Sequence, residues 1–258
     1  MKSKNFLIPD GIEYYIGNDA IKFDKLKSNI LKAYNKYNYT YIVPPIFDSL
    51  DNLLNLNSTD LDNKTSHILD SSTGNEIGVR ADITPQISKV DYQLTKGLGN
   101  SKFSYMGDIL RLSPGPFDRI NPFQTGVEYF GKINKRVDIE VIKLMIDLIC
   151  FSKQNKIIIE LGDLSFINKL LSGLELTQEY KLRLIDLINL KSKSEIKLFF
   201  KKHKLSNKKL TFLLELMGIS GDISVLSELK KLAKKYKLNL TSEIRELLSI
   251  SNLSLIHI

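Results

Sequence analysis

The chain has 258 residues, 43% of them hydrophobic, with a formal net charge of +8, a single cysteine and three scattered histidines. That length is enough for a sizeable core in one or two domains, whereas a lone Cys150 excludes a disulfide framework and a thiolate zinc site. The sequence contains no run of about 18 apolar residues, so no membrane span is predicted, and the N-terminal apolar run is too short for a signal peptide. We therefore expect a cytoplasmic protein with neither a metal nor another cofactor.

Positive charge is concentrated between Lys191 and Lys237, where 13 lysines stand against four acidic residues, a local excess of 13 − 4 = +9. A basic segment can bind nucleic acid. We see no interleaving of aromatic or arginine side chains of the kind that base stacking uses. We interpret these lysines as solvated helix faces and do not expect a nucleic-acid partner; RNA binding stays open as an alternative.

An amphipathic helix is predicted near the N-terminus, with Asn18 as its N-cap. Its apolar residues recur at spacings of three and four: Phe23, Leu26, Ile30, Tyr34 and Tyr37. The β-branched and aromatic residues 39–43 predict a strand, which Pro44 and Pro45 end because proline cannot donate to a ladder.

The following elements alternate in type. A helix is predicted over 49–56, a strand, turn and strand over 67–80, and a helix that Asp82 or Thr84 caps and in which Pro85 lies near the start. Further on, the sequence predicts strands over 103–112 and 127–131, a helix over 138–151 and a short buried strand over 157–159.

From Leu164 onward the periodicity is helical throughout. The predicted helices cover 165–171, 179–190, 194–203, 208–217, 225–236 and 242–248. The sequence thus predicts an α+β part, residues 1–163, and a mostly helical part, residues 164–250. Residues 251–258 predict the beginning of another strand.

Two segments carry a resemblance to known proteins. The first, GVRADITPQISKVD, spans Gly78–Asp91; the second, YMGDILR followed by PGP and PFQTGVEYFG, lies between Tyr105 and Gly131. Together they resemble the core of class II aminoacyl-tRNA synthetases of the histidyl type, and residues 39–45 resemble the first motif of that class. Pro9-Asp10-Gly11 also fits the opening of these proteins. The resemblance covers residues 6 to about 165, and implies an antiparallel sheet flanked by helices, with a helical insertion-like domain after it.

Within that superfamily, the run RADITPQ that begins at Arg80 is similar to the regulatory subunits of ATP phosphoribosyltransferase, a histidyl-tRNA synthetase-like family. Synthetases carry a glutamate two residues after a phosphate-binding arginine, whereas Ser113 follows Arg111 here. Arg119 is the only cation between Leu112 and Gly131, although a bound triphosphate needs several. The resemblance therefore implies a subunit without catalysis of its own.

What the resemblance implies for function is a partner and an oligomer. Such a subunit binds the short-form catalytic subunit of ATP phosphoribosyltransferase and is needed for its activity in the first step of histidine biosynthesis. It also implies a homodimer within a hetero-oligomer, built on Phe23, Leu26, Ile30 and the strand 39–43, and a feedback response to histidine.

A histidine-like pocket is the last implication of the resemblance. Its candidate ligand-binding residues are Asp82, Thr84, Arg111, Gln124 and Glu128. Carboxylates pair with an ammonium group, and amide or hydroxyl groups satisfy the remaining donors. Gln124 and Glu128 face the same side of a strand, and Gly126 between them leaves room for a ligand. The alternative is a buried polar network that was inherited without its ligand.

No glycine follows Gly221, although both related families continue with a tyrosine-rich, histidine-contacting segment and a glycine-rich final motif. The sequence predicts a C-terminally truncated protein: a naturally short form, a truncated reading frame or a degenerate copy. An alternative function is therefore that of a diverged or truncated histidyl-tRNA synthetase-like protein that binds an amino acid or tRNA.

Overall fold

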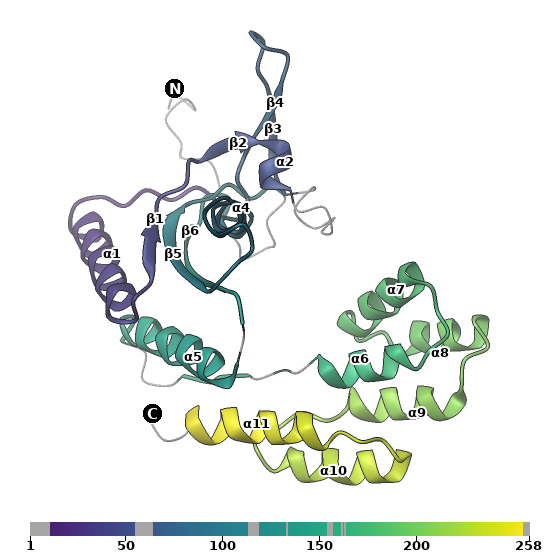
Figure 1. Cartoon of the computed structure of the whole chain (residues 1–258). Helices are drawn as coiled ribbons and strands as arrows, with labels where there is room; N and C mark the ends of the chain where they lie inside the picture. Colours follow the sequence, from purple (N-terminus) through teal and green to yellow (C-terminus); the bar gives the residue numbers. More distant parts are fainter. Residues whose placement is uncertain are drawn as a thin grey trace, which may run out of the picture. The chain divides into compact units, whose positions relative to one another are not determined.

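The computed structural model describes residues 11–54, 64–112, 119–132, 134–153, 157–160, 162 and 164–254. The chain divides into two compact units, residues 1–156 and 157–258 (Figure 1). In the described ranges, no helix combines the length and apolarity needed to cross a bilayer. Nor do those ranges bring three or more histidine, cysteine or acidic side chains together as metal ligands.

A three-stranded sheet lies at the centre of the first unit. It consists of β1 (Thr40–Ile42), β5 (Ser101–Asp108) and β6 (Phe123–Phe130), in the order β1–β5–β6. Strands β5 and β6 are antiparallel, but β1 runs parallel to β5. The sheet is therefore mixed, where the sequence predicts a purely antiparallel one. The reason is the long crossover from β1 to β5, which includes a helix, as parallel pairs require.

Helices cover both faces of this sheet. On one face, α1 (Asn18–Lys36) and α5 (Lys135–Cys150) bury Tyr34 and Leu144 against Met106 of β5. On the other face, α4 (Thr84–Thr95) lies over β5 and β6 (Figure 1). Successive strand residues point to opposite faces, so Tyr105 of β5 packs with α4 while its neighbour Met106 packs with α1 and α5.

A smaller antiparallel sheet stands beside the first in the same unit. It has the order β2–β4–β3, with β2 (Phe47–Ser49), β4 (Glu76–Val79) and β3 (Ser66–Leu69); the short helix α2 (Leu50–Leu53) follows β2. The carboxylate of Asp70 organises the β3–β4 turn, because it accepts hydrogen bonds from the Ser72 amide at 2.9 Å and the Thr73 hydroxyl at 2.6 Å. The strand–turn–strand prediction is confirmed.

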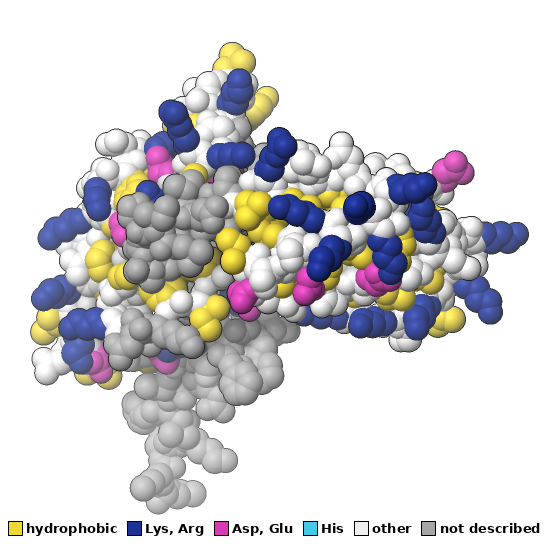
Figure 2. Space-filling model, turned by 90° about the horizontal axis from the view of Figure 1, so that it is seen from below, with side chains coloured by type: hydrophobic (Ala, Val, Ile, Leu, Met, Phe, Trp, Pro, Cys, Tyr) yellow, Lys and Arg dark blue, Asp and Glu magenta, His cyan; other side chains and the backbone are white. Residues whose placement is uncertain are grey.

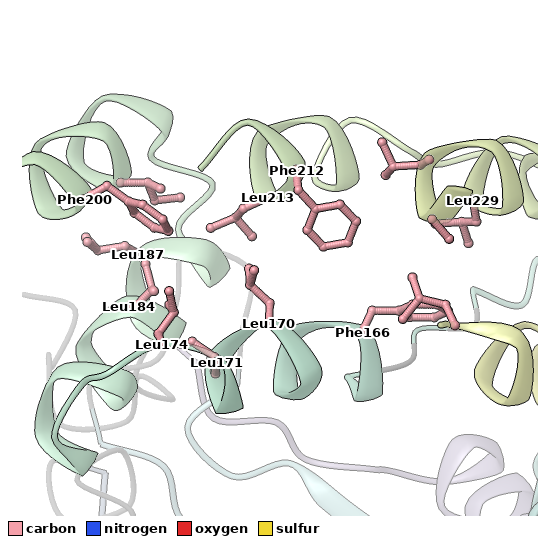
Figure 3. Close-up of a cluster of buried hydrophobic side chains, with 14 of the residues drawn as sticks. Phe166, Leu170, Leu171, Leu174, Leu184, Leu187, Phe200, Phe212, Leu213 and Leu229 are labelled. Carbon is pink, nitrogen blue, oxygen red and sulfur yellow. The ribbon is translucent and has the colours of Figure 1, made fainter. Parts of the chain in front are cut away.

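The second unit is helical. Its elements are α6 (Ser165–Ser172), α7 (Gln178–Asn189), α8 (Lys193–Lys202), α9 (Asn207–Leu216), α10 (Val225–Tyr236) and α11 (Thr241–Ser254). Figure 3 shows their shared apolar core, in which Leu170 of α6 points toward Leu213 of α9. Phe200 and Phe212 are each only 1% exposed. The unit therefore has a hydrophobic core of its own.

Several element boundaries differ from the sequence prediction. Gly17, not Asn18, occupies the N-cap position of α1, and α5 begins earlier than predicted, where the Asn134 side chain accepts a hydrogen bond from the Arg136 amide at 2.9 Å. No strand forms over 157–159: Ile158 is 73% exposed and pairs with no strand. Helix α11 continues to Ser254, so the strand predicted from 251 is wrong up to that residue; residues 255–258 lie outside the described part.

The core of the second unit generates a stability prediction. Replacing Phe212 with alanine should lower the free energy of unfolding by about 3–5 kcal/mol, because a large buried ring is lost and a cavity remains. Leu182→Ala on α7, where the side chain is 54% exposed, should change the free energy by less than about 0.5 kcal/mol. Urea unfolding followed by far-UV circular dichroism measures both. Equal losses in the two variants would contradict this packing.

Candidate functional site

The candidate site begins at the turn that leads into α4. The Thr84 amide donates a hydrogen bond to the Asp82 carboxylate at 2.8 Å, so Asp82 satisfies one of the free N–H groups at this helix start. Pro85 follows, and a missing N–H is tolerated at that position. The prediction that Asp82 or Thr84 caps this helix is wrong in position, because Ile83 occupies the N-cap and makes no side-chain capping hydrogen bond; Asp82 lies one residue earlier and accepts from the first helical amide.

Gln124 ties this turn to strand β6. Its side-chain oxygen accepts a hydrogen bond from the Ile83 amide at 2.9 Å, and its side-chain nitrogen donates to Asp82 at 3.1 Å. Both ends of the amide are therefore used, which fixes its orientation. Ile83 itself is fully buried against β5, so the turn is held from both sides.

Glu128 lies four residues after Gln124, on the same face of β6, and joins the same cluster. The Thr84 hydroxyl donates to Glu128 at 3.1 Å, and the Tyr105 hydroxyl lies 3.1 Å from Thr84 and 3.5 Å from Glu128. Burial raises the pKa of Glu128; the Thr84 hydrogen bond opposes that shift and the nearby negative charge of Asp82 adds to it. Burial also raises the pKa of Tyr105, to about 12, so its hydroxyl stays protonated and can donate.

Gly126 has a different role from the one the sequence predicts. It lies directly opposite Tyr105 in the strand register. A Cβ atom added to Gly126 would lie 2.5 Å from the Tyr105 hydroxyl oxygen and 2.6 Å from the ring carbon that carries it. The missing side chain therefore makes room for the tyrosine, not for a ligand.

Four of the five predicted ligand-binding residues thus meet in one hydrogen-bonded cluster: Asp82, Thr84, Gln124 and Glu128. The fifth, Arg111, is half-buried beside it, and its Nε donates to the Ala81 carbonyl at 3.5 Å, the limit of hydrogen-bond distance. Among the residues described, no lysine or arginine forms an ion pair with Asp82 or Glu128. Within the described ranges the cluster therefore presents two carboxylates that pair with no lysine or arginine, an arrangement that suits a cationic group.

Two residues of this region were named in the sequence motifs without a role. Tyr105 supplies a hydroxyl to the cluster, and Arg80 is a buried cation beneath the turn, only 4% exposed. Neither role is readable from the sequence, since each depends on which strand residues face one another. In the local sequence, only Gly126, a small residue between two polar positions, indicates that a large side chain lies opposite on the neighbouring strand.

The second unit contains a separate, open groove of about 630 Å³ between α7 and α8. The rings of Tyr180 and Phe199 lie 4.3 Å and 4.4 Å from that of His203, with Arg183, Lys201 and Lys202 around them. No residue that the sequence predicted for a site lines it. On the face seen in Figure 2, Lys and Arg side chains are spread among hydrophobic and acidic ones, as on a solvated surface.

The raised pKa of Glu128 predicts a pH-dependent stability difference. At a pH below 4.5, the ordinary pKa of a glutamate, Glu128 is protonated in both the folded and the unfolded chain. As the pH rises past that value, the unfolded chain loses this proton first, so folding stability falls. Glu128→Gln keeps the acceptor for Thr84 without the charge. Its melting temperature relative to the wild type should therefore rise between pH 4 and pH 7; a difference that does not change with pH would contradict the shift.

Comparison with known proteins places this chain in a family. The profile described as histidyl-tRNA synthetase matches residues 11–254. An ATP phosphoribosyltransferase regulatory subunit from Teredinibacter turnerae is 28% identical over 252 residues, which is 97% of this chain and 64% of the relative. One from Hahella chejuensis is 30% identical over 196 residues, 76% of this chain and 49% of the relative. The chain therefore spans about half to two thirds of these curated relatives.

Solved structures share the fold. An ATP phosphoribosyltransferase regulatory subunit/histidyl-tRNA synthetase from Bacillus halodurans superposes with a TM-score of 0.77 at 20% identity, over 98% of this chain and 65% of that one. The ATP phosphoribosyl transferase (HisG:HisZ) complex from Thermotoga maritima gives 0.63 at 19% identity, over 89% and 75%. The predicted α+β fold of the class II synthetase type is confirmed, and the chain belongs to the histidyl-tRNA synthetase family.

Proposed function

We propose that this chain is a non-catalytic regulatory subunit of ATP phosphoribosyltransferase, which binds a short-form catalytic subunit and is needed for its activity. The observation that carries the proposal is an asymmetry within the family site. The four residues expected to hold an amino acid are joined in one network, whereas the residues expected for ATP are not kept. Curated relatives named as such regulatory subunits support the same function.

The ATP side of the site is poor in cations. Arg119, the single cation between Leu112 and Gly131, lies 2.7 Å from Glu13 and 3.2 Å from the Tyr15 hydroxyl. Its charge is therefore already paired. Ser113, which lies outside the described residues, stands where a synthetase carries a glutamate. A triphosphate would meet little positive charge here, which supports a subunit that does not activate amino acids.

Histidine is the ligand that we propose for the cluster around Asp82 and Glu128. Its ammonium group would supply the cation that these carboxylates lack, and the Thr84 and Tyr105 hydroxyls can reorient toward its polar atoms. Arg111, half-buried beside Ala81, is the remaining candidate contact, for a carboxylate group. Binding in this way would make the chain the histidine-responsive part of the complex.

We also propose that two copies of the chain pair through the α1–β1 region, within a larger assembly with the catalytic subunit. Two of the residues expected at that surface are used inside the subunit instead, because Ile30 and Tyr39 belong to its core. Exposed apolar residues within or next to α1 and β1 include Ile16, Ile21, Leu26 and Val43. An apolar surface of this kind is typical of obligate interfaces. The complex from Thermotoga maritima supports the wider assembly.

The regulatory function is tested by reconstitution. A short-form ATP phosphoribosyltransferase catalytic subunit should co-purify with this chain and form phosphoribosyl-ATP much faster in its presence than alone. ATP–pyrophosphate exchange by the chain itself should stay at background with every amino acid, because the cations for ATP are missing. Histidine-dependent exchange would instead support a diverged synthetase, and an unchanged transferase rate would remove the regulatory function.

Removing one negative charge from the proposed histidine pocket tests whether the pocket binds histidine. Glu128→Gln keeps the shape but removes a carboxylate, and a charge-assisted hydrogen bond contributes about 1.5–3 kcal/mol. Calorimetric titration should therefore show histidine affinity falling about ten- to a hundred-fold. The matched control is Glu140→Gln on α5, which removes the half-buried ion pair with Lys102 at 2.7 Å but lies on the other face of the sheet; it should leave the affinity unchanged. No histidine binding by the wild type, alone or with its partner, would leave only an inherited polar network.

A further inference from the structure

Arg80 follows β4 and carries a guanidinium that is almost completely buried. Its Nε donates to the Asp108 carbonyl at 2.9 Å, and one terminal nitrogen donates to the carbonyls of Pro44 at 2.7 Å and Pro45 at 3.1 Å. Burial lowers the pKa of Arg80, and the carboxylate of Asp108 partly opposes that shift. The side chain thus joins the segment after β1 to the end of β5 through their backbones.

The position of the guanidinium depends on Gly107. A Cβ atom added to Gly107 would lie 2.3 Å from the second terminal nitrogen of Arg80 and 3.6 Å from the Ile83 side chain. The backbone of Gly107 is ordinary strand, with no positive φ, so glycine is needed here for space alone. Any larger residue would have to push Arg80 away.

Arg80 is connected to the cluster around Asp82 and Glu128 in two ways, through the chain and through contacts with β5 and β6. Gly107 is the strand partner of Gln124. Gln124 holds Asp82 and the Ile83 amide, and these lie two and three residues after Arg80 in the chain. The main chain of Arg80 is also fixed, because its amide donates to Ile46 at 3.1 Å and its carbonyl accepts from Leu110 at 3.0 Å.

We propose that Arg80 is a positioning residue for this pocket: it fixes the turn that carries Asp82, the Ile83 amide and Thr84 against Gln124, and so sets the affinity for the ligand. The proposal rests on the proposed function for its ligand, histidine. Its physical basis is the planar fork of arginine, which reaches carbonyls of two segments at once. A lysine ammonium is a point charge on a flexible stem and cannot hold the same geometry.

Two variants disturb this contact from opposite ends. Arg80→Lys removes the planar guanidinium. Gly107→Ala instead pushes the guanidinium aside, while Arg80 and every residue of the pocket keep their identity. Each should weaken histidine binding about ten-fold or more, since small displacements of positioned groups have large effects. Each should also speed hydrogen exchange of the Ile83 and Thr84 amides. The double variant should lose little more than either single one, because both act on one contact.

The matched control is Leu144→Ala on α5, where a side chain 1% exposed packs against the opposite face of the sheet. It should lower the melting temperature but leave histidine affinity and the exchange of both amides unchanged. If Arg80→Lys and Gly107→Ala behave like this control, with lower melting temperatures and nothing else, Arg80 only supports the fold and the proposal is wrong. If the wild type binds no histidine, the proposed ligand is wrong, while amide exchange still decides the role of Arg80. Should one variant fail to fold, the other carries the test.

Discussion

The structure around α4 depends on two carboxylates that share one partly buried cluster. Asp82 and Glu128 are linked through Thr84 and Gln124, and no described cation forms an ion pair with either of them. Burying charge without a partner is costly, which is why burial raises the pKa of Glu128. Hydroxyl and amide donors offset part of this cost. The rest makes the cluster complementary to an ammonium group.

Two arginines of this unit, Arg80 and Arg119, are engaged away from the two carboxylates. Arg80 donates to the backbone carbonyls of Pro44, Pro45 and Asp108, and Arg119 pairs with Glu13. One cation therefore stabilises the scaffold under the turn, and the other is neutralised at the surface. Neither arginine therefore pairs with Asp82 or Glu128, which suits the ammonium group of the proposed amino-acid ligand.

Local patterns in the sequence predict much of this arrangement. Period-two alternation places Gln124 and Glu128 on one strand face, and helical periodicity predicts the helices of the second unit. Cross-strand register is not local, so the pairing of Gly126 with Tyr105 and of Gly107 with Gln124 could not be predicted. The same limit hides the role of Arg80, whose three acceptors come from two distant segments.

Two predictions from residue patterns depend on packing partners that the patterns do not show. The apolar stripe of α1 predicts a surface for a second copy; Ile30 of that stripe packs inside the subunit, since the stripe also covers its own sheet, whereas Leu26 stays exposed. The β-branched residues 157–159 predict a buried strand, but they pair with no neighbouring strand, and Ile158 is exposed. A pattern of residue types predicts which element a segment can form. Whether the segment forms it depends on the segments that it packs or pairs with.

In the proposed pocket, a ligand's cation completes the pair of carboxylates. Carbon-13 NMR of the Glu128 side-chain carboxyl, titrated with pH, measures this directly. Without ligand, the titration should give a pKa above the ordinary value for glutamate, because burial disfavours the charge. With saturating histidine, an adjacent ammonium favours the charge, and the pKa should fall. A Glu128 titration that is the same with and without histidine would show that no ammonium group binds beside this carboxylate.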